Sequence, residues 1–251
     1  MRYSDDMFPL TDEIPTLPKR LYCFHHAGGS VLAFRTWLRR FSGVDTIPVE
    51  LPGHYCSIGQ ACSVDFDSTA HAIARGIATL GTSGASLFGH SLGCALAFQV
   101  AVILRSEYDS PLEQLIVAGR HAPCDQDPIG YRTSQGMGAL KEEMVRIGAT
   151  PREVIDDPAF SQVFLPIIYS DYRLHESYRY RGERLDIPIV ALAGMHDMDA
   201  NPQAMLRWSL VTSADFSQFS FPGSHFFLYG ESAPKVERCI ADQLSQRAVA
   251  C

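Results

Sequence analysis

The chain has 251 residues, of which 46% are hydrophobic, 20% charged and 10% aromatic, and its formal net charge is −7. This composition supplies enough apolar side chains for a buried core and excludes an intrinsically disordered protein. The acidic balance, without any run of basic residues, argues against nucleic acid as a partner.

Seven cysteines are scattered along the chain without a Cys-x-x-Cys pair, which argues against a disulfide scaffold and a structural zinc module. The N-terminal residues carry acids and prolines where a signal peptide needs a basic end and an apolar run. No apolar stretch reaches the roughly 20 residues that a membrane span requires. We therefore expect reduced thiols, a cytoplasmic location and no membrane partner.

Short apolar runs alternate with amphipathic segments of helical length. In chain order, strands are predicted at 21–24, 46–51, 85–88, 114–118, 187–193 and 216–221. Helices are predicted at 31–41, 67–80, 92–104, 202–210 and 233–244. Such alternation predicts an α/β fold in which helices cover both faces of a mostly parallel sheet.

Residues 121–185 break this alternation because no strand is apparent there. Helices are predicted instead at 134–147, 152–155 and 158–178. An insertion between two strands of such a sheet lies near their carboxyl ends, where ligands bind. We expect a single domain over residues 1–251 with a helical lid over about 121–185.

Gly89 to Gly93 matches the Gly-x-Ser-x-Gly nucleophile elbow, with Ser91 at its centre. The motif lies between a predicted strand and a predicted helix, as the elbow requires. Its glycines are needed because the turn leaves no room for side chains on either side of the serine. Ser91 is therefore the candidate nucleophile.

A serine hydroxyl needs a base, and the base needs an acid to orient it. In this architecture the order along the chain is serine, acid, histidine. His225 follows the last predicted strand and is the candidate base. Asp197 and Asp199 both follow the preceding strand; Asp197 is favoured as the acid, and Asp199 remains the alternative or a helix cap.

Two backbone amides are candidates for stabilising an oxyanion. One is the N–H of Leu92, at the start of the helix that follows the elbow. The other is expected from the glycine-rich loop after the first strand, with Ala27 favoured and His26 adjacent. No metal-binding motif accompanies the histidines there, so we expect no metal. Cys94 is expected to pack inside the helix.

Several longer phrases are more particular than the elbow. They are residues 24–30, 50–54, 88–93, 147–151, 164–166, 171–174, 176–180 and 222–227. In these phrases the chain resembles the type II thioesterases, stand-alone α/β-hydrolases that accompany nonribosomal peptide and polyketide synthases. The resemblance places the family triad on Ser91, Asp197 and His225, and the oxyanion amides on Ala27 and Leu92.

The resemblance implies hydrolysis of acyl groups from the phosphopantetheine arm of carrier domains, through an acyl-serine intermediate and without a cofactor. The units removed would be stalled or misprimed acyl groups, starters or products. The partners implied are acyl or peptidyl carrier domains, and the chain is expected to be a monomer. It departs from the family pattern at His25 and His26, at His54, where an arginine is usual, and at Ala200.

Alternatives remain open at this point. An esterase, lipase or acyltransferase acting on free small molecules would use the same triad, and a non-catalytic carrier-binding protein is a third reading. The basic residues of the lid either dock a carrier domain or form solvated surface, and its apolar residues either line an acyl pocket or pack the lid. The basic residues are Arg173, Arg179, Arg181 and Arg184; the apolar ones are Met137, Leu140, Met144, Phe160 and Phe164.

Overall fold

The computed structural model describes residues 7–10, 17–125, 130–148 and 150–246. Six strands form one sheet in the order β2-β1-β3-β4-β5-β6, and every neighbouring pair is parallel. The predicted α/β class with a parallel sheet is therefore confirmed. The strands are β1 Lys19–Phe24, β2 Val44–Val49, β3 Ala85–His90, β4 Leu112–Ala118, β5 Ile189–Gly194 and β6 Phe216–Phe221.

Alternation along the strands distributes side chains to the two faces of the sheet. Tyr22 and Phe24 of β1 pack in the cluster that includes helices α1 (Phe66–Leu80) and α2 (Leu92–Tyr108). Leu21 and Cys23 point to the other face, toward the short helix η1 (Val31–Trp37) and α7 (Ala233–Gln246). Both faces are covered, so the central strand β3 is buried along its whole length.

Three predicted helices differ locally from expectation. Of the helix predicted at 31–41, only residues 31–37 are helical, and they form the 3-10 helix η1. Arg39, which follows, has a left-handed backbone conformation with φ 60°. Residues 134–147 are divided into η3 (Thr133–Gln135) and α3 (Gly136–Arg146) because Gly136, at φ 82°, turns the chain between them. Residues 202–210 become α6 (Pro202–Met205) followed by the tighter η4 (Leu206–Val211).

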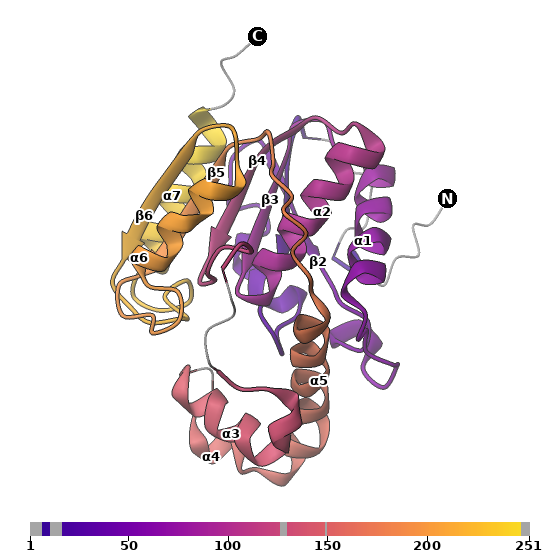
Figure 1. Ribbon diagram of the computed structural model, residues 1–251, viewed down its shortest axis with the longest axis vertical. Helices are drawn as coiled ribbons and strands as arrows, with labels where there is room; N and C mark the ends of the chain where they lie inside the picture. Colours follow the sequence, from indigo (N-terminus) through magenta and orange to yellow (C-terminus); the bar gives the residue numbers. More distant parts are fainter. Residues whose placement is uncertain (1–6, 11–16, 126–129, 149, 247–251) are drawn as a thin grey trace.

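Between β4 and β5, the described residues form η3, followed by the longer helices α3, α4 (Arg152–Ile155) and α5 (Pro158–Ser177). We refer to the last three helices as the helical insertion. They lie beyond the ends of the strands, on one side of the sheet, and α5 runs back toward the core (Figure 1). The helical insertion has an apolar cluster of its own, in which Leu140 and Met144 are buried.

None of the helices in the described part of the chain combines the length and the apolar character that crossing a bilayer requires.

Candidate active site

Ser91 occupies the sharp turn between β3 and α2. Its backbone adopts φ 54° and ψ −117°, a conformation that few non-glycine residues adopt. Strained backbone conformations of this kind are common at functional sites. A side chain on Gly89 would collide with the backbone of Gly93, and one on Gly93 would collide with the carbonyl of Phe24. The glycines of the motif are therefore required by the close approach of β1, β3 and α2.

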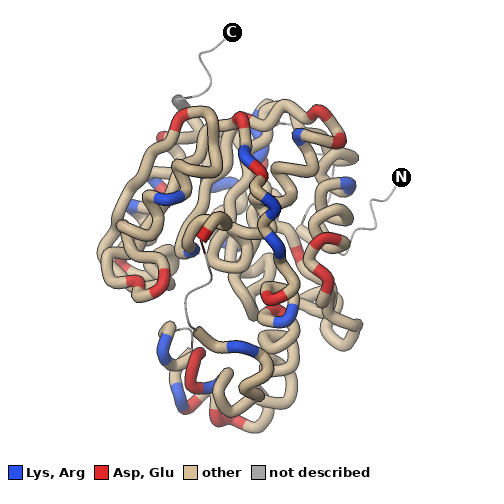
Figure 2. Tube along the Cα trace, in the orientation of Figure 1, with Lys and Arg blue, Asp and Glu red and all other residues tan. Residues whose placement is uncertain are grey.

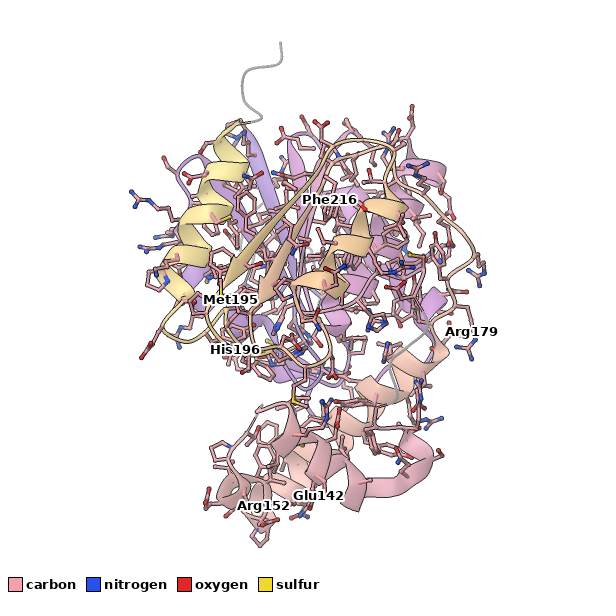
Figure 3. All side chains as sticks on the ribbon, turned by 60° about the vertical axis from the view of Figure 1, so that its left-hand side comes forward. Glu142, Arg152, Arg179, Met195, His196 and Phe216 are labelled. Atoms are coloured by element: carbon pink, nitrogen blue, oxygen red, sulfur yellow. The ribbon has the colours of Figure 1, made fainter. Side chains whose placement is uncertain are left out.

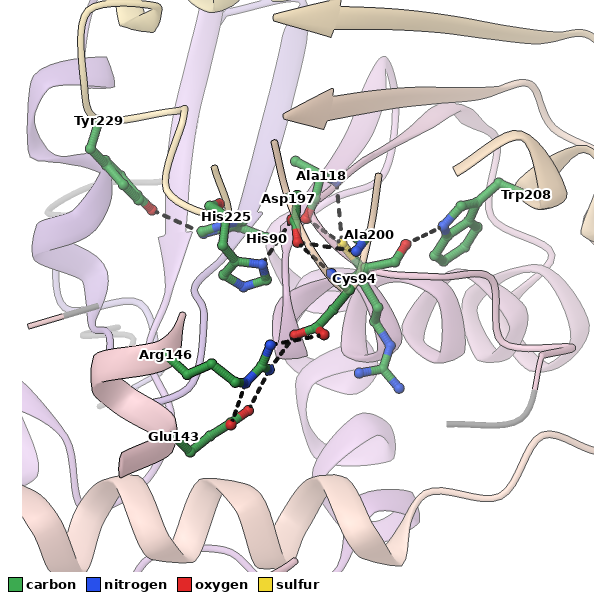
Figure 4. A network of polar contacts seen from close by, with 12 residues as sticks. His90, Cys94, Ala118, Glu143, Arg146, Asp197, Ala200, Trp208, His225 and Tyr229 are labelled. Atoms are coloured by element: carbon green, nitrogen blue, oxygen red, sulfur yellow. Dashed lines mark hydrogen bonds and ion pairs between the residues drawn. The ribbon is translucent and has the colours of Figure 1, made fainter. Parts of the chain in front are cut away.

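His225 and Asp197 come from the loops after β6 and β5 and form a hydrogen bond. The His225 Nδ1 lies 2.9 Å from the Asp197 Oδ2 (Figure 4). The Asp197 Oδ1 accepts from the backbone N–H groups of Asp199 and Ala200, at 3.0 and 3.1 Å. Burial favours a raised pKa for Asp197, but the bonds to His225 and to these amides outweigh it and lower the pKa below its usual value. Asp197 is therefore an ionised acceptor that holds a hydrogen on His225 Nδ1.

Ser91 and His225 line the same two cavities. With Nδ1 engaged by Asp197, the Nε2 of His225 is the ring nitrogen that can take a proton from a hydroxyl. Among the hydrogen bonds between described residues, none joins Ser91 Oγ to this ring. Such bonds are commonly long without substrate and tighten in the complex.

Asp199, the alternative acid, binds Arg146 in the helical insertion. Its carboxylate accepts two hydrogen bonds from Arg146 of α3, at 3.2 and 2.6 Å. Arg146 also contacts Glu143 one turn earlier in the same helix. Of the two aspartates that the sequence offered, the structure therefore brings Asp197 to the histidine and Asp199 to the helical insertion.

His90, at the variable position of the motif just before Ser91, contacts the backbone of His225. Its Nε2 donates to the His225 carbonyl at 3.0 Å, and its Nδ1 faces the Tyr229 hydroxyl at 3.4 Å. His26 packs edge-on against His90, with ring centroids 5.2 Å apart. Burial lowers the pKa of His26 to about 3 and that of His90 far below its usual value, so both rings are neutral beside the candidate base. Nothing in the motif indicated this role for His90.

The two candidate oxyanion donors come from different segments of the chain. Leu92 is the first residue of α2, where N–H groups have no partner within the helix. Ala27 lies in the loop after β1, and both residues line the same cavity as Ser91. The next amide, Gly28 N–H, donates to Asp171 of α5 at 2.7 Å. In the sequence, Asp171 stands only within the phrase 171–174 and carries no indication of this contact, because only the fold brings α5 to this loop.

Two cavities of about 120 Å³ each meet at Ser91. The first includes the charged residues Arg120, Glu143 and Arg146 in its lining. The second is lined mainly by apolar residues of the helical insertion, among them Phe160 and Phe164. Of the insertion's apolar residues considered above, Leu140 packs inside it and Met137 is exposed. Met144 and Phe160 pack there and also line the second cavity, which Phe164 lines as well.

Within the described parts of the chain, no group of three or more histidine, cysteine, aspartate or glutamate side chains is arranged to hold a metal ion. Five cysteines, Cys23, Cys62, Cys94, Cys124 and Cys239, are free thiols, and Cys94 is buried in α2, where burial raises the pKa of its thiol to about 12. Cys251 lies outside the described residues.

Known proteins share this arrangement of elements. The thioesterase domain family matches residues 19–244. The thioesterase PikA5 of Streptomyces venezuelae is 30% identical over 218 residues, which cover 85% of this chain and 77% of that protein. The solved structure of BorB, the type II thioesterase from the borrelidin biosynthetic cluster, is 32% identical, with a TM-score of 0.81 over 92% of this chain and 94% of that one. The solved structure of ClbQ, from the colibactin NRPS/PKS pathway, is 25% identical, with a TM-score of 0.80 over 91% of this chain and 97% of that one.

The family match covers the sheet, the elbow and the loops that carry His225 and Asp197. The hydrolytic geometry and the resemblance of the longer phrases thus agree with the comparisons. This chain belongs to the thioesterase domain family and is a type II thioesterase, an α/β-hydrolase that acts on thioester bonds.

Proposed function

We propose that this enzyme hydrolyses acyl groups from the phosphopantetheine arm of carrier domains, with Ser91, His225 and Asp197 as its triad. The observation that carries this proposal is the 2.9 Å bond between His225 and Asp197, beside a cavity that both His225 and the strained Ser91 line. The nucleophile, the base and the orienting acid follow the order of the α/β-hydrolases.

In the first half of the reaction, Ser91 Oγ attacks the thioester carbonyl while His225 Nε2 takes its proton. The resulting oxyanion is held by the backbone N–H groups of Ala27 and Leu92. Collapse of this intermediate expels the thiol, which takes the proton from His225, and leaves an acyl ester on Ser91. Asp197 stabilises the imidazolium that forms in each proton transfer.

In the second half, His225 activates a water molecule that attacks the acyl ester, and the acid is released as Ser91 regains its proton. We propose that the chain is a single α/β-hydrolase domain in which the helical insertion serves as a lid. A lid of this kind admits a long acyl arm and limits the access of bulk water to the acyl-enzyme. No cofactor is needed for these steps.

The proposed substrate class follows from the relatives. BorB comes from the borrelidin biosynthetic cluster, and ClbQ comes from the colibactin NRPS/PKS pathway. We infer that carrier domains of such a synthase are the partners of this monomeric, cytoplasmic enzyme. The two cavities that meet at Ser91 provide separate space for the acyl group and for the arm that delivers it.

The basic residues after α5 are largely occupied within the protein. Basic residues recur along the segment that connects α5 to β5, with acidic residues between them (Figure 2). Arg181 pairs with Asp67, and Arg179 donates to the carbonyls of Glu176 and Tyr178. All four arginines considered for carrier docking are exposed, and Arg184 donates to the Thr212 carbonyl at 2.9 Å; we propose Arg173, on α5, as the docking contact.

The test uses a carrier protein loaded with a short acyl chain and measures release of free acid by mass spectrometry. We expect the wild-type enzyme to release the acid and Ser91→Ala to be inactive. The same acyl group presented as a simple oxyester separates the alternative function. A higher kcat/KM on the oxyester than on the carrier thioester would identify an esterase, and acyl transfer to an added alcohol would identify an acyltransferase.

A further inference from the structure

Asp171 of α5 joins the helical insertion to the oxyanion loop, defined here as residues 26–29. Its Oδ2 accepts the Gly28 backbone N–H at 2.7 Å and the His54 Nε2–H at 3.0 Å. Both side chains are buried, Asp171 with 1% and His54 with 2% of its surface exposed. Three segments that are distant in sequence therefore converge on one carboxylate oxygen.

The hydrogen bonds of His54 determine its charge. Its Nδ1 faces the Pro52 carbonyl at 3.2 Å, and a carbonyl can only accept, so Nδ1 carries a hydrogen. Its Nε2 donates to the Asp171 carboxylate, so the ring carries both hydrogens and a positive charge. Burial lowers the pKa of His54, but the bonds to Asp171 and Pro52, with the nearby Glu50, raise it above the usual value.

Other ionisable groups surround this pair. The His25 ring lies 5.1 Å from the His54 ring between centroids, and the His25 Nε2 is 3.5 Å from the Glu50 carboxylate. Cys62 is close enough to Asp171 for the carboxylate to contribute to the raised pKa of its thiol, after burial. His54 is the basic group that contacts Asp171 directly.

Steric packing reinforces the contact. A Cβ on Gly28 would lie 2.5 Å from Cγ1 of Ile168, which precedes Asp171 by three residues on α5. The helix therefore rests directly on the Gly28 backbone, which has φ +74°. The bond to Asp171 fixes the Ala27–Gly28 peptide, and the N–H of Ala27, the proposed oxyanion donor, belongs to the peptide immediately before it, so its position depends on where Gly28 is held.

We propose that Asp171, charged and paired with His54, is a positioning residue that holds the oxyanion loop against α5, so that the Ala27 amide is aligned only while the helical insertion is seated. This inference rests on the proposed thioesterase mechanism. Asp171 acts through Gly28 and does not touch the reacting atoms. A misplacement of about 1 Å in such a donor can reduce the rate about 100-fold.

The test compares Asp171→Asn with Glu176→Gln. Glu176 lies on the same helix and accepts two hydrogen bonds, from the Thr133 amide at 2.7 Å and the Thr133 hydroxyl at 2.5 Å. These bonds join it to Thr133 and not to the oxyanion loop. We expect Asp171→Asn to lower kcat about 10- to 100-fold on an acyl-carrier thioester, with KM changed less than about threefold. Glu176→Gln should keep kcat within about threefold of wild type.

A second variant supplies a pH readout. In the wild type, kcat should fall as pH rises through the raised pKa of His54, because loss of the Nε2 hydrogen removes the donor that faces Asp171. His54→Gln donates from an amide at every pH, so this alkaline decline should disappear. A structural role alone would lower thermal stability without changing the shape of the pH profile.

The outcomes separate the two claims. Activity of the wild type and of Glu176→Gln, with none in Ser91→Ala, supports the thioesterase mechanism whatever Asp171 does. Equal kcat losses in Asp171→Asn and Glu176→Gln, or an unchanged kcat with a raised KM in Asp171→Asn, would overturn the positioning role. If Asp171→Asn does not fold by circular dichroism, an alkaline decline retained in His54→Gln would overturn it.

Discussion

Arg146 near the end of α3 and Asp199 in the loop after β5 form a two-point ion pair, with nitrogen to oxygen distances of 3.2 and 2.6 Å (Figure 4). The pair joins the helical insertion to the loop after β5, and both residues line the first of the two cavities at Ser91. Glu143 binds the same guanidinium, and the two carboxylates raise the pKa of Arg146, so it stays charged. The helical insertion therefore contacts the core through the Arg146–Asp199 ion pair of α3 and through the hydrogen bonds of Asp171 in α5.

Breaking the Arg146 pair should loosen the last turn of α3. We expect Arg146→Gln to speed amide hydrogen exchange there by about fivefold, equivalent to about 1 kcal/mol, because the pair is partly exposed. Arg152→Gln is the matched control, since Arg152 pairs with Glu142 inside the helical insertion (Figure 3). Equal acceleration in both variants would show that Arg146 has no special role in seating the insertion.

The two neighbouring aspartates should differ sharply in their effect on turnover. Asp197→Asn is expected to lower kcat by about 10³- to 10⁴-fold, because an amide in that place no longer holds the correct tautomer of His225. Asp199→Asn should cost less than about tenfold, since its carboxylate binds Arg146 and not His225. Steady-state hydrolysis of one thioester by both variants decides the assignment, and the reverse order would make Asp199 the acid.

A methyl group on Gly28 should disable the oxyanion loop. Gly28→Ala places Cβ 2.5 Å from Cγ1 of Ile168, so α5 or the loop must move, and kcat should fall at least about tenfold. Gly43→Ala is the control, because Gly43 has nearly the same φ, +72°, with nothing within 4 Å of the added carbon. That variant should cost about 1 kcal/mol of stability from backbone strain and leave kcat unchanged. Similar kcat in the two variants would refute the steric argument.

The His54–Asp171 pair should make stability depend on pH in a defined direction. The pKa of His54 is raised in the folded state, so its contribution to the free energy of unfolding is complete below its unfolded pKa of about 6.5. The contribution is lost as pH rises through the folded pKa. Urea unfolding of wild type and His54→Gln at several pH values should therefore show a difference in stability that shrinks with rising pH. A difference that grows instead would mean that His54 is neutral in the fold.

Local sequence patterns were sufficient to predict the strands of the sheet and the nucleophile elbow. The apolar runs predicted the six strands because burial on both faces of a parallel sheet demands them, and the glycines around Ser91 marked the elbow because the turn excludes side chains. The position of His225 after the last strand followed from the order of elements. These features depend on residues close together in the chain, so they can be recognised without knowing the packing.

The tertiary structure decided what depends on distant contacts. Asp197 and Asp199 are two residues apart in the same loop. The packing of α3 shows that Arg146 binds Asp199, while Asp197 binds His225. His54 and Asp171 are separated by 117 positions, and no local pattern indicates that they share an oxygen with the Gly28 amide. The physical reason is that periodicity and turn sterics act along the chain, whereas the partner of a buried charge is set by which helix the core brings against it.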